Sequence, residues 1–343
     1  MTRRSSWVLL IAVAAVAAAA PISHGFVERW YSNGFYPHLQ RAVTTCSNLA
    51  PFSLFDVLCL VLVAAFGVAV YRAIRGRGWN RGARLIVWIL LRGAAVVYLV
   101  FLATWGLNYR RVALKDKLAF DARGVTRARG EALVARTVAS LNRLYADAHR
   151  GPTPLDALAG AFASADAALG ARVPIVPARP KETLLGGYFH EAAISGMTDP
   201  FLLETLLSPD LLTVERPFVI AHEWGHLAGY ADESEASYVS WLACQRSDAA
   251  AQYSAWLALL GSLEPFLSRA QSLAALDAGP RIDLAEMRYR YERTSPIVRA
   301  AARETYDGYL KANRVEAGVA SYDLVVQLIL GTELDGEGNP RRR

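Results

Sequence analysis

The sequence has few cysteines, and their spacing excludes several kinds of site. Only three cysteines occur among its 343 residues, at Cys46, Cys59 and Cys244. No two are close enough along the chain for a thiolate metal site or a redox motif. We therefore expect neither of these, and Cys244 to be a small core residue. A disulfide between Cys46 and Cys244 would form only if the two segments that carry them pack together.

The sequence also lacks any nucleic-acid-binding motif and any internal repeat. Its net charge of +6 comes from many arginines, several of which cluster at residues 72–84 and at 341–343. Without an accompanying motif, this charge is better explained by membrane orientation and a solvated surface than by nucleic-acid binding. We therefore expect no nucleic-acid partner.

Apolar residues are abundant, at 53% of the chain, and the mean hydropathy is +0.20. Such a composition indicates membrane spans and a lipid bilayer as a partner. We predict three transmembrane helices, at about residues 7–22, 54–74 and 85–105, and no later stretch is long enough without charges. The first could instead be a cleaved signal peptide, because a basic start precedes a short apolar run ending in Ala18-Ala19-Ala20-Pro21.

Arginines between the second and third spans give the predicted orientation. This basic cluster should stay in the cytoplasm, which places residues 21–53 and the chain after Trp105 outside it. We predict a membrane domain at 1–109, an extracytoplasmic domain at 110–332 and a disordered tail at 333–343. The expected location is the inner membrane of a bacterial cell, crossed several times.

One stretch of the outer domain, His222-Glu223-Trp224-Gly225-His226, indicates chemistry. On a helix His222 and His226 lie one turn apart on the same face, where two neutral imidazoles can hold one Zn²⁺. Glu223 can then take a proton from a metal-bound water. The neighbouring residues between Pro217 and Gly229 are apolar and indicate a buried helix, in which these polar groups would be costly without a partner such as a metal.

A catalytic zinc usually has three protein ligands, and the sequence leaves three acids open as the third. Asp232 continues a metzincin-like pattern after Gly229, whereas Glu233 or Glu235 would complete a gluzincin-like pattern. Asp232 and Glu235 also form a capping-box pattern, so a second helix should begin at Asp232, with Glu233 and Glu235 about 200° apart. We favour Glu233, because small residues share its helix face, then Glu235, then Asp232.

The outer domain is predicted to be mainly helical with a small β element. Apolar residues at helical spacing predict helices at 126–148, 154–169, from Pro217, and at 232–245, 249–267, 284–291, 296–312 and 324–330. The glycine-containing segment 183–197 is the predicted sheet or hairpin. Within it, residues 192–196 are the candidate edge strand for aligning a peptide by β-addition.

Several further stretches make the chain resemble the bacterial domain-of-unknown-function 3810 family over most of its length. They are Tyr36-Pro37, Pro51-Phe52-Ser53-Leu54-Phe55-Asp56, Trp105-Gly106-Leu107-Asn108-Tyr109-Arg110, Glu233-Ser234-Glu235-Ala236, Tyr306-Asp307-Gly308-Tyr309-Leu310-Lys311 and Gly318-Val319-Ala320-Ser321-Tyr322, besides the His222–His226 motif. The resemblance implies a membrane-bound, zinc-metallopeptidase-like protein and no particular substrate. The family's glutamate pair at positions 233 and 235 disfavours Asp232 as ligand. Ser237 stands where the family often has Asn.

These features predict a membrane-anchored zinc metallopeptidase with a zincin-like outer domain, acting on a peptide or protein near the membrane surface. Glu223 would be the general base, and Tyr322, Tyr309 or Tyr306 would stabilise the oxyanion, with His190 as a further possibility. One alternative is a non-enzymatic zinc-binding membrane protein, against which the intact Glu223 argues. The other is a metal-dependent amidase acting on another cell-envelope substrate.

Overall fold

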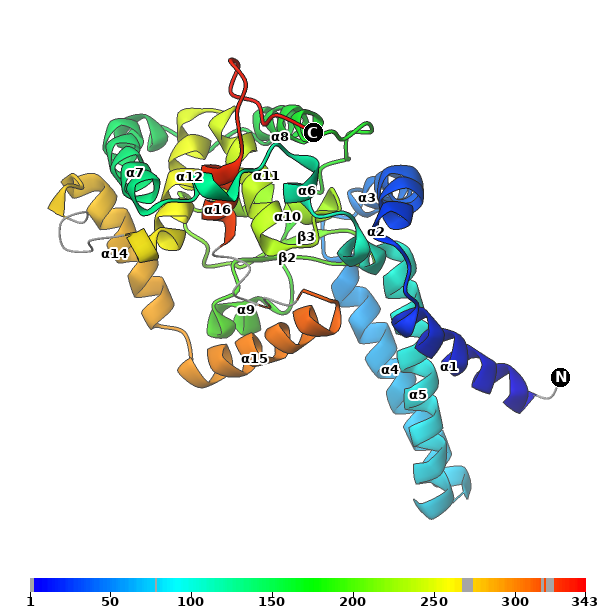
Figure 1. Cartoon of the computed structure of the whole chain (residues 1–343). Coiled ribbons are helices and arrows are strands. Elements are labelled where there is room, and N and C mark those ends of the chain that lie inside the picture. Colours follow the sequence, from blue (N-terminus) through cyan, green and yellow to red (C-terminus); the bar gives the residue numbers. More distant parts are fainter. Residues whose placement is uncertain (1–2, 78, 267–273, 316–317, 319–323) are drawn as a thin grey trace.

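The computed structural model describes residues 3–77, 79–266, 274–315, 318 and 324–343 (Figure 1). The chain is mainly helical, as predicted, with one small sheet. Its first part consists of α1 (Arg3–Ala19), α2 (His24–Phe26), the π-helix η1 (Val27–Phe35), α3 (Tyr36–Ser47), α4 (Leu54–Arg77), α5 (Trp79–Thr104) and the 3₁₀ helix η2 (Gly106–Arg110).

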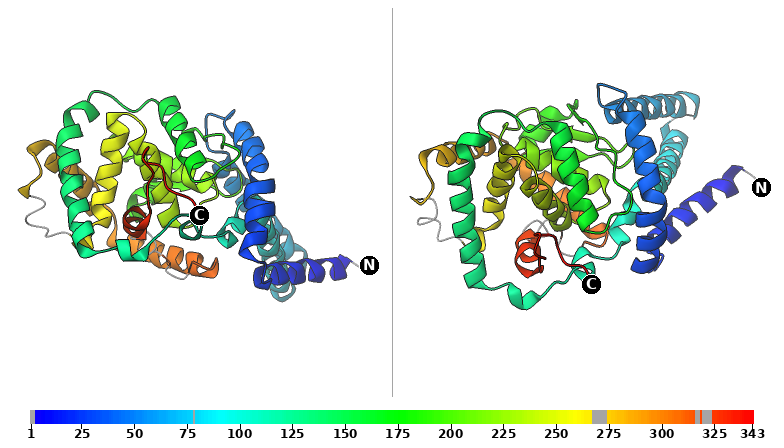
Figure 2. Two further views of the ribbon diagram at one scale, coloured as in Figure 1. Left: turned by 45° about the horizontal axis from the view of Figure 1, so that its top comes forward. Right: turned by 90° about the horizontal axis from the view of Figure 1, so that it is seen from above.

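Two of these helices have the length and composition of membrane spans. Leu54–Arg75 of α4 and Gly82–Thr104 of α5 qualify, and Figure 1 shows both helices extending away from the rest of the chain. A third span is reached only if Trp7–Ala19 and His24–Ser47 count as one, and these are bent by 106°. Residues 21–53, which the predicted topology places between the first and second spans, are largely helical. In both views of Figure 2, α1 (dark blue) points away from the outer domain.

The start of α4 is fixed by side chains of the outer domain. The buried Glu204 carboxylate accepts the backbone N–H groups of Leu54 and Phe55, at 3.2 and 2.8 Å, and forms an ion pair with the buried Lys181. Asp56 accepts a hydrogen bond from the Leu184 N–H at 2.8 Å. These contacts satisfy donors that a helix start leaves open, and they join α4 to the outer domain.

The outer domain places two helices at its centre and others around them. Its helices are α6 (Leu114–Lys117), η3 (Ala122–Gly124), α7 (Arg127–Ala148), α8 (Leu155–Ala168), α9 (Gly186–Ala192), α10 (Arg216–Leu227), α11 (Glu233–Gln245), α12 (Ala249–Ser262), η4 (Glu264–Phe266), α14 (Ala278–Glu292), α15 (Pro296–Ala312) and α16 (Val325–Gly331). α10 packs on α11, α8 and α12 flank this pair, and α7 covers α12 (Figure 2).

The β element is smaller than the sequence suggested and is displaced along the chain. β1 (Pro180–Lys181), β3 (Thr205–Leu207) and β2 (Gly196–Thr198) form a sheet in that order, with β1 parallel and β2 antiparallel to β3. The seven residues Gly186–Ala192 of this segment form α9 instead, because Phe189 and Ala192, three residues apart, are both buried against the core. The prediction of an edge strand at 192–196 was therefore wrong in position, since β2 begins at Gly196.

The last residues are ordered by pairing with the chain that follows α6. Ala119 donates its N–H to the Arg341 carbonyl at 2.8 Å, and Arg341 donates to the Glu333 carbonyl at 2.8 Å. Isolated bridges also join Leu118 to Arg342 and Leu334 to Pro340. Residues 333–343 are thus not the disordered tail that their charge suggested, because their backbone groups have partners.

One continuous core joins the first part of the chain to the outer domain. It includes Tyr36 of α3 and Phe101 and Trp105 at the end of α5, together with Trp224 of α10 and Tyr238 of α11. The boundary that we placed at residue 109 therefore lies within packed structure and not in a linker. All three cysteines are free, and Cys244 is fully buried, as expected of a core residue.

Candidate metal centre

The helix α10 carries the first two candidate ligands, and its sequence explains its bounds. Pro217 lies in its first turn, where no N–H is needed, and Gly229 just beyond its end has φ +83°. Trp224 is fully buried and donates its indole N–H to the Ala178 carbonyl at 2.9 Å. The helix is thus buried along most of its length, as predicted.

Three donors from outside this helix bind the carbonyl groups at its end. The indole N–H of Trp105 donates to the His226 carbonyl and the Tyr36 hydroxyl donates to the Leu227 carbonyl, each at 2.8 Å. Arg111 donates to the Gly229 carbonyl at 2.9 Å. The end of the His222–His226 motif is therefore held in part by segments that precede the outer domain, through Tyr36 and Trp105.

The next helix, α11, begins where the capping pattern predicted. Asp232 is its N-cap and accepts the N–H groups of Ser234 and Glu235, at 2.9 and 3.4 Å. A Cβ atom added at Gly225 would lie 3.0 Å from the Cα of Ala236. Glycine at 225 therefore allows the close packing of α10 on α11 that brings Glu233 to the histidines.

His222, His226 and Glu233 form one cluster. A carboxylate oxygen of Glu233 lies 3.1 Å from Nε2 of His222 and 3.4 Å from Nε2 of His226. The potential ligand atoms of the three residues all lie within 4.8 Å of one another. The Glu233 side chain is 1% exposed, so this negative charge is almost completely removed from water. Two imidazole nitrogens and one carboxylate are a donor set that Zn²⁺ favours.

Further contacts orient these ligands. Nδ1 of His226 lies 2.8 Å from the Tyr230 carbonyl oxygen, which fixes the N–H at Nδ1 and turns Nε2 toward Glu233. Nδ1 of His222 lies 3.2 Å from the Ser237 hydroxyl. The Ser237 hydroxyl can therefore orient the His222 ring.

Glu235, our second choice as third ligand, lies outside the cluster. Its buried carboxylate accepts the N–H of Leu114, on the side of α11 away from the histidines. Asp232, our third choice, is occupied as the N-cap. Residues two positions apart on a helix point about 200° away from each other, so only one of Glu233 and Glu235 can face α10.

Glu223 lies beside the cluster and is held by the sheet. The Thr198 hydroxyl lies 2.8 Å from Oε2 of Glu223 and 2.9 Å from its backbone carbonyl oxygen. A Cβ atom added at Gly196 would lie 2.8 Å from Oε1. Burial raises the pKa of Glu223, and the nearby histidines only partly offset this. No local sequence pattern could indicate the role of Thr198, because 25 residues separate it from Glu223.

The tyrosines proposed as oxyanion donors have different positions. The Tyr306 hydroxyl donates to Oε1 of Glu233, and the Tyr309 ring stacks on that of Tyr306 with centroids 5.9 Å apart. Tyr322 lies outside the described residues. His190 forms an ion pair with Asp210 at 2.7 Å and does not line the cavity of the cluster.

The charges within the cluster are strongly coupled. Burial raises the pKa of Glu233, but the two histidines outweigh it and hold the pKa well below its usual range. Burial lowers the pKa of His226, but Glu233 and Glu223 outweigh it and raise the pKa to about 9. The buried carboxylates thus favour positive charge at this point of the fold.

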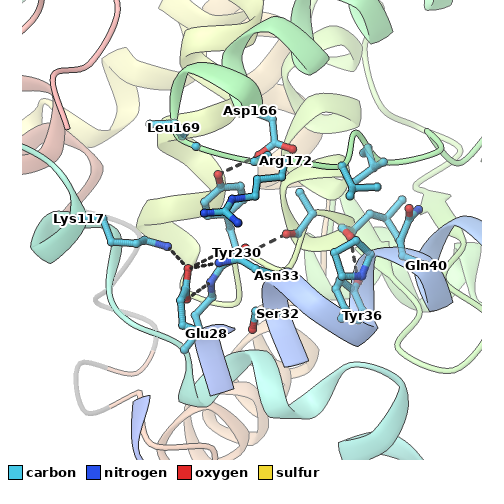
Figure 3. Close-up of a pocket in the computed structure, with 18 of the residues that line it drawn as sticks. Glu28, Ser32, Asn33, Tyr36, Gln40, Lys117, Asp166, Leu169, Arg172 and Tyr230 are labelled. Atoms are coloured by element: carbon cyan, nitrogen blue, oxygen red, sulfur yellow. Dashed lines mark hydrogen bonds and ion pairs between the residues drawn. The ribbon is translucent and has the colours of Figure 1, made fainter. Parts of the chain in front are cut away.

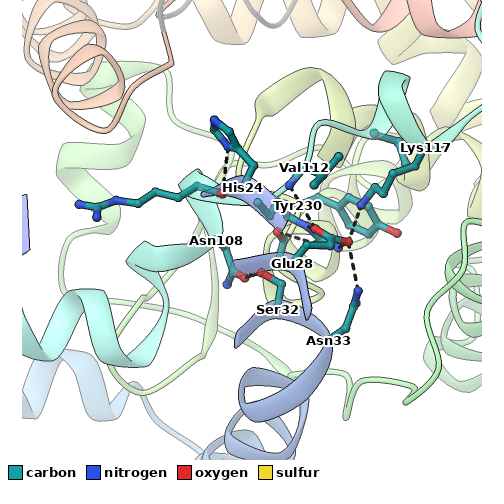
Figure 4. Close-up of polar contacts among 12 residues, drawn as sticks. His24, Glu28, Ser32, Asn33, Asn108, Val112, Lys117 and Tyr230 are labelled. Carbon is teal, nitrogen blue, oxygen red and sulfur yellow. Dashed lines mark hydrogen bonds and ion pairs between the residues drawn. The ribbon is translucent and has the colours of Figure 1, made fainter. Parts of the chain in front are cut away.

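A second polar network contacts the cluster through Tyr230. The Tyr230 hydroxyl donates to Asp166 at 2.9 Å (Figure 3). The Arg111 guanidinium lies over the Tyr230 ring, 5.1 Å from its centroid. Glu28 of the π-helix accepts hydrogen bonds from Arg111 and from Lys117, the latter at 2.9 Å (Figure 4). Tyr230, whose carbonyl orients His226, is thus itself held by the buried Asp166 and the partly buried Arg111.

The cluster opens into a cavity of about 1430 Å³. His222, Glu223, His226 and Glu233 line it together with residues of α5, α9, β2 and α15. Such a volume exceeds that of ordinary small-molecule sites, which are ~300–1,000 Å³.

Fold and site together define a mainly helical protein with two or three potential membrane spans and a buried His–His–Glu cluster that could hold a metal ion. The chain belongs to the family described as "Protein of unknown function (DUF3810)", which matches residues 31–330. The predicted family is thus confirmed, and the matched range contains every candidate ligand. No curated protein matches the chain, and no solved structure matches it.

Proposed function

We propose that this chain is a membrane-anchored zinc metallopeptidase with a zincin-like outer domain. The observation that supports it best is the convergence of His222, His226 and Glu233 within 4.8 Å, with Glu223 lining the same cavity. A purely structural metal site has no need of a buried glutamate beside its ligands.

The proposed zinc ligands are His222, His226 and Glu233, a three-residue set that leaves a position open for water. Zn²⁺ bound there would supply Lewis-acid polarisation and lower the pKa of water toward ~7. The contact of His226 with the Tyr230 carbonyl fits zinc ligation, because it directs Nε2 to the position between His222 and Glu233.

Glu223 is the proposed general base. It takes one proton from the attacking water, whose oxygen bonds to the peptide carbonyl carbon, and delivers it to the leaving nitrogen as the C–N bond breaks. The products are a carboxylic acid and an amine, which exchange a proton to become a carboxylate and an ammonium at neutral pH, and one water is consumed. Thr198 holds the Glu223 carboxylate in place, and Tyr306, Tyr309 or Tyr322 is the proposed oxyanion donor.

The substrate is proposed to bind as an extended peptide along β2. In the described part of the chain this strand pairs only with β3, so its other edge is open for β-addition. Ser195 to Thr198 line the cavity beside Glu223, which places the open edge next to the cluster. This arrangement favours a peptide over other amides.

The proposed location is the inner membrane of a bacterial cell, with three spans and the outer domain outside the cytoplasm. This orientation rests on the arginines between α4 and α5, which tend to remain in the cytoplasm.

The test is Glu223→Gln in the purified full-length protein. Both proteins should bind one zinc per chain by elemental analysis, and only the wild type should cleave a degenerate peptide library followed by mass spectrometry. We expect the variant to lose at least ~10²-fold in rate. Equal cleavage by both proteins, or no zinc in either, would contradict the proposal.

A further inference from the structure

The cavity of the cluster is not confined to the outer domain. One of its walls is formed by α5, the helix that contains the apolar stretch Gly82–Thr104. The α5 side chains on this wall are Ala94, Val97, Tyr98 and Phe101, and Phe55 of α4 lines it as well. Each of these α5 positions lies three or four residues from at least one of the others, so they share one face of the helix.

The wall extends well down the apolar helix. Ala94 precedes the end of α5 at Thr104 by ten residues, or about 15 Å at ~1.5 Å per residue. This is about half of a ~30 Å hydrocarbon layer. The cavity that contains the cluster therefore reaches the depth of the lipid chains if α5 spans a membrane.

The opposite wall is formed by α15, which Figure 1 shows along the side of the outer domain from which α4 and α5 extend. Ala302, Tyr306 and Tyr309 on one face of this helix line the cavity. The Tyr309 ring meets the Phe101 ring with centroids 6.2 Å apart, so α15 and α5 touch near the outer end of α5. From this contact the cavity continues along α5 toward the N-terminal end of the helix, past Val97 to Ala94.

We propose that the substrate is a membrane-anchored polypeptide whose apolar segment enters this cavity along α5 from the bilayer, which delivers the adjacent extended segment to the cluster. This inference rests on the proposed function and specifies its substrate class. The cut falls just outside the membrane, because the cluster lies beyond the end of α5, where Trp105 binds the His226 carbonyl.

One observation favours an apolar polypeptide over a lipid as the occupant. The open edge of β2 lies in the same cavity and offers backbone groups that suit an extended chain and not acyl chains. The volume of about 1430 Å³ exceeds the space that a drug-sized ligand fills, so it is large enough for a polypeptide segment. The apolar wall on α5 and the polar edge of β2 match a chain that is apolar at one end and extended at the other.

α5 provides a matched pair of variants. Val97 and Val96 are neighbours with similar exposure, 44% and 43%, but only Val97 lines the cavity. Val97→Trp should fill the cavity wall, whereas Val96→Trp points away from it toward lipid. Ala94→Phe is a second filling variant, for the case that Val97→Trp fails to fold.

The binding experiment uses full-length Glu223→Gln protein in lipid nanodiscs. The probe is a degenerate peptide of about ten residues fused to an apolar helix of about 20 residues, with a photoreactive leucine in the first turn of that helix. We expect cross-links to the cavity face of α5, reduced about tenfold by Val97→Trp or Ala94→Phe and unchanged by Val96→Trp. Cross-links that are absent, or equally affected by both tryptophans, would overturn the inference, and absence is the result expected if lipid fills the cavity.

A cleavage experiment separates this inference from the proposed function. Wild-type protein should cleave the anchored library at least about tenfold faster than the same library without its apolar helix. Equal cleavage of both libraries would overturn the membrane route while the peptidase proposal stands. Cavity-specific cross-links without any cleavage would overturn the peptidase proposal while the membrane-facing binding site stands.

Discussion

Glu233 and Glu235 are separated by one residue and have different surroundings. Glu233 faces the two histidines, whereas Glu235 receives the N–H of Leu114. The difference follows from their rotation about the α11 axis, which was fixed once Asp232 was recognised as the cap. A three-ligand site needs a carboxylate whose oxygen is directed at the same position as the two imidazole nitrogens.

We therefore predict that Glu233→Ala loses zinc, while Glu235→Ala and Asp232→Ala keep it. Zinc affinity should fall by more than ~100-fold, the upper end of the effect of an outer-shell partner. Ser237→Ala should lower it by ~10–100-fold, because it removes a contact to His222. Metal titration with a chelator, monitored on folded protein, measures these values. Loss of zinc from Glu235→Ala alone would show that our ligand assignment is wrong.

Glu28 should make the stability of the fold depend on pH. Burial raises its pKa, but Arg111 and Lys117 outweigh burial and lower the pKa from 4.5 to about 2. The folded state thus binds this proton more weakly than the unfolded state. Ionised Glu28 stabilises the fold above pH ~4.5, and this contribution is lost as the pH falls toward 2.

Glu28→Gln should therefore destabilise the protein at neutral pH by roughly 2–3 kcal/mol, and the gap to wild type should close between pH 4.5 and 2. Denaturant unfolding of the detergent-solubilised chain over this pH range measures it. Glu131→Gln is the control, since its pair with Arg127 is exposed and should contribute less than ~1 kcal/mol. A gap that stays constant with pH would contradict the assigned role of Glu28.

Among the elements, local sequence signals predicted some features well and others poorly. The α10 helix, the cap at Asp232 and the helix Pro296–Ala312 follow from apolar spacing and capping residues near in sequence. α9 was missed because it has only seven residues and begins with two glycines. The contacts of Tyr36 and Trp105 with α10 cross more than 100 residues, so no local pattern could indicate them.

The start of α4 should depend on a single side chain of the outer domain for its stability. Its first N–H groups are bound by Glu204, whose side chain is fully buried together with Lys181. Glu204→Ala would leave both the helix start and the Lys181 ammonium without their partner. We expect a loss of ~3–5 kcal/mol, typical of a broken buried ion pair.

Thermal unfolding in detergent measures this loss, with Glu292→Ala as its control. Glu292 pairs with Arg288 on the surface of α14, where side chains are 54% and 79% exposed, so its removal should cost less than ~1 kcal/mol. Similar midpoints for the two variants would mean that the outer domain does not fix α4.

For the whole molecule, the shared core determines which part of the chain can fold. Trp105 and Tyr36 bind carbonyls at the end of α10, and both are core residues beside Trp224. An outer domain cut at residue 110 would lose both donors and expose the apolar surface that they cover. Each Å² of apolar surface exposed in this way costs ~25 cal/mol, against a typical total stability of only ~5–15 kcal/mol.

We therefore predict that residues 110–343 alone fail to fold or to bind zinc, whereas a chain that begins at residue 21 does both in detergent. The longer chain lacks only α1, whose described hydrogen bonds to the rest run from its carbonyl end to Arg110 and Arg314. Circular dichroism melting and zinc content compare the two chains. If the shorter chain melts cooperatively with one zinc bound, the cluster is independent of the membrane segment. The close coupling between cluster and α5, on which the membrane route for substrate depends, would then be much weaker than the shared core indicates.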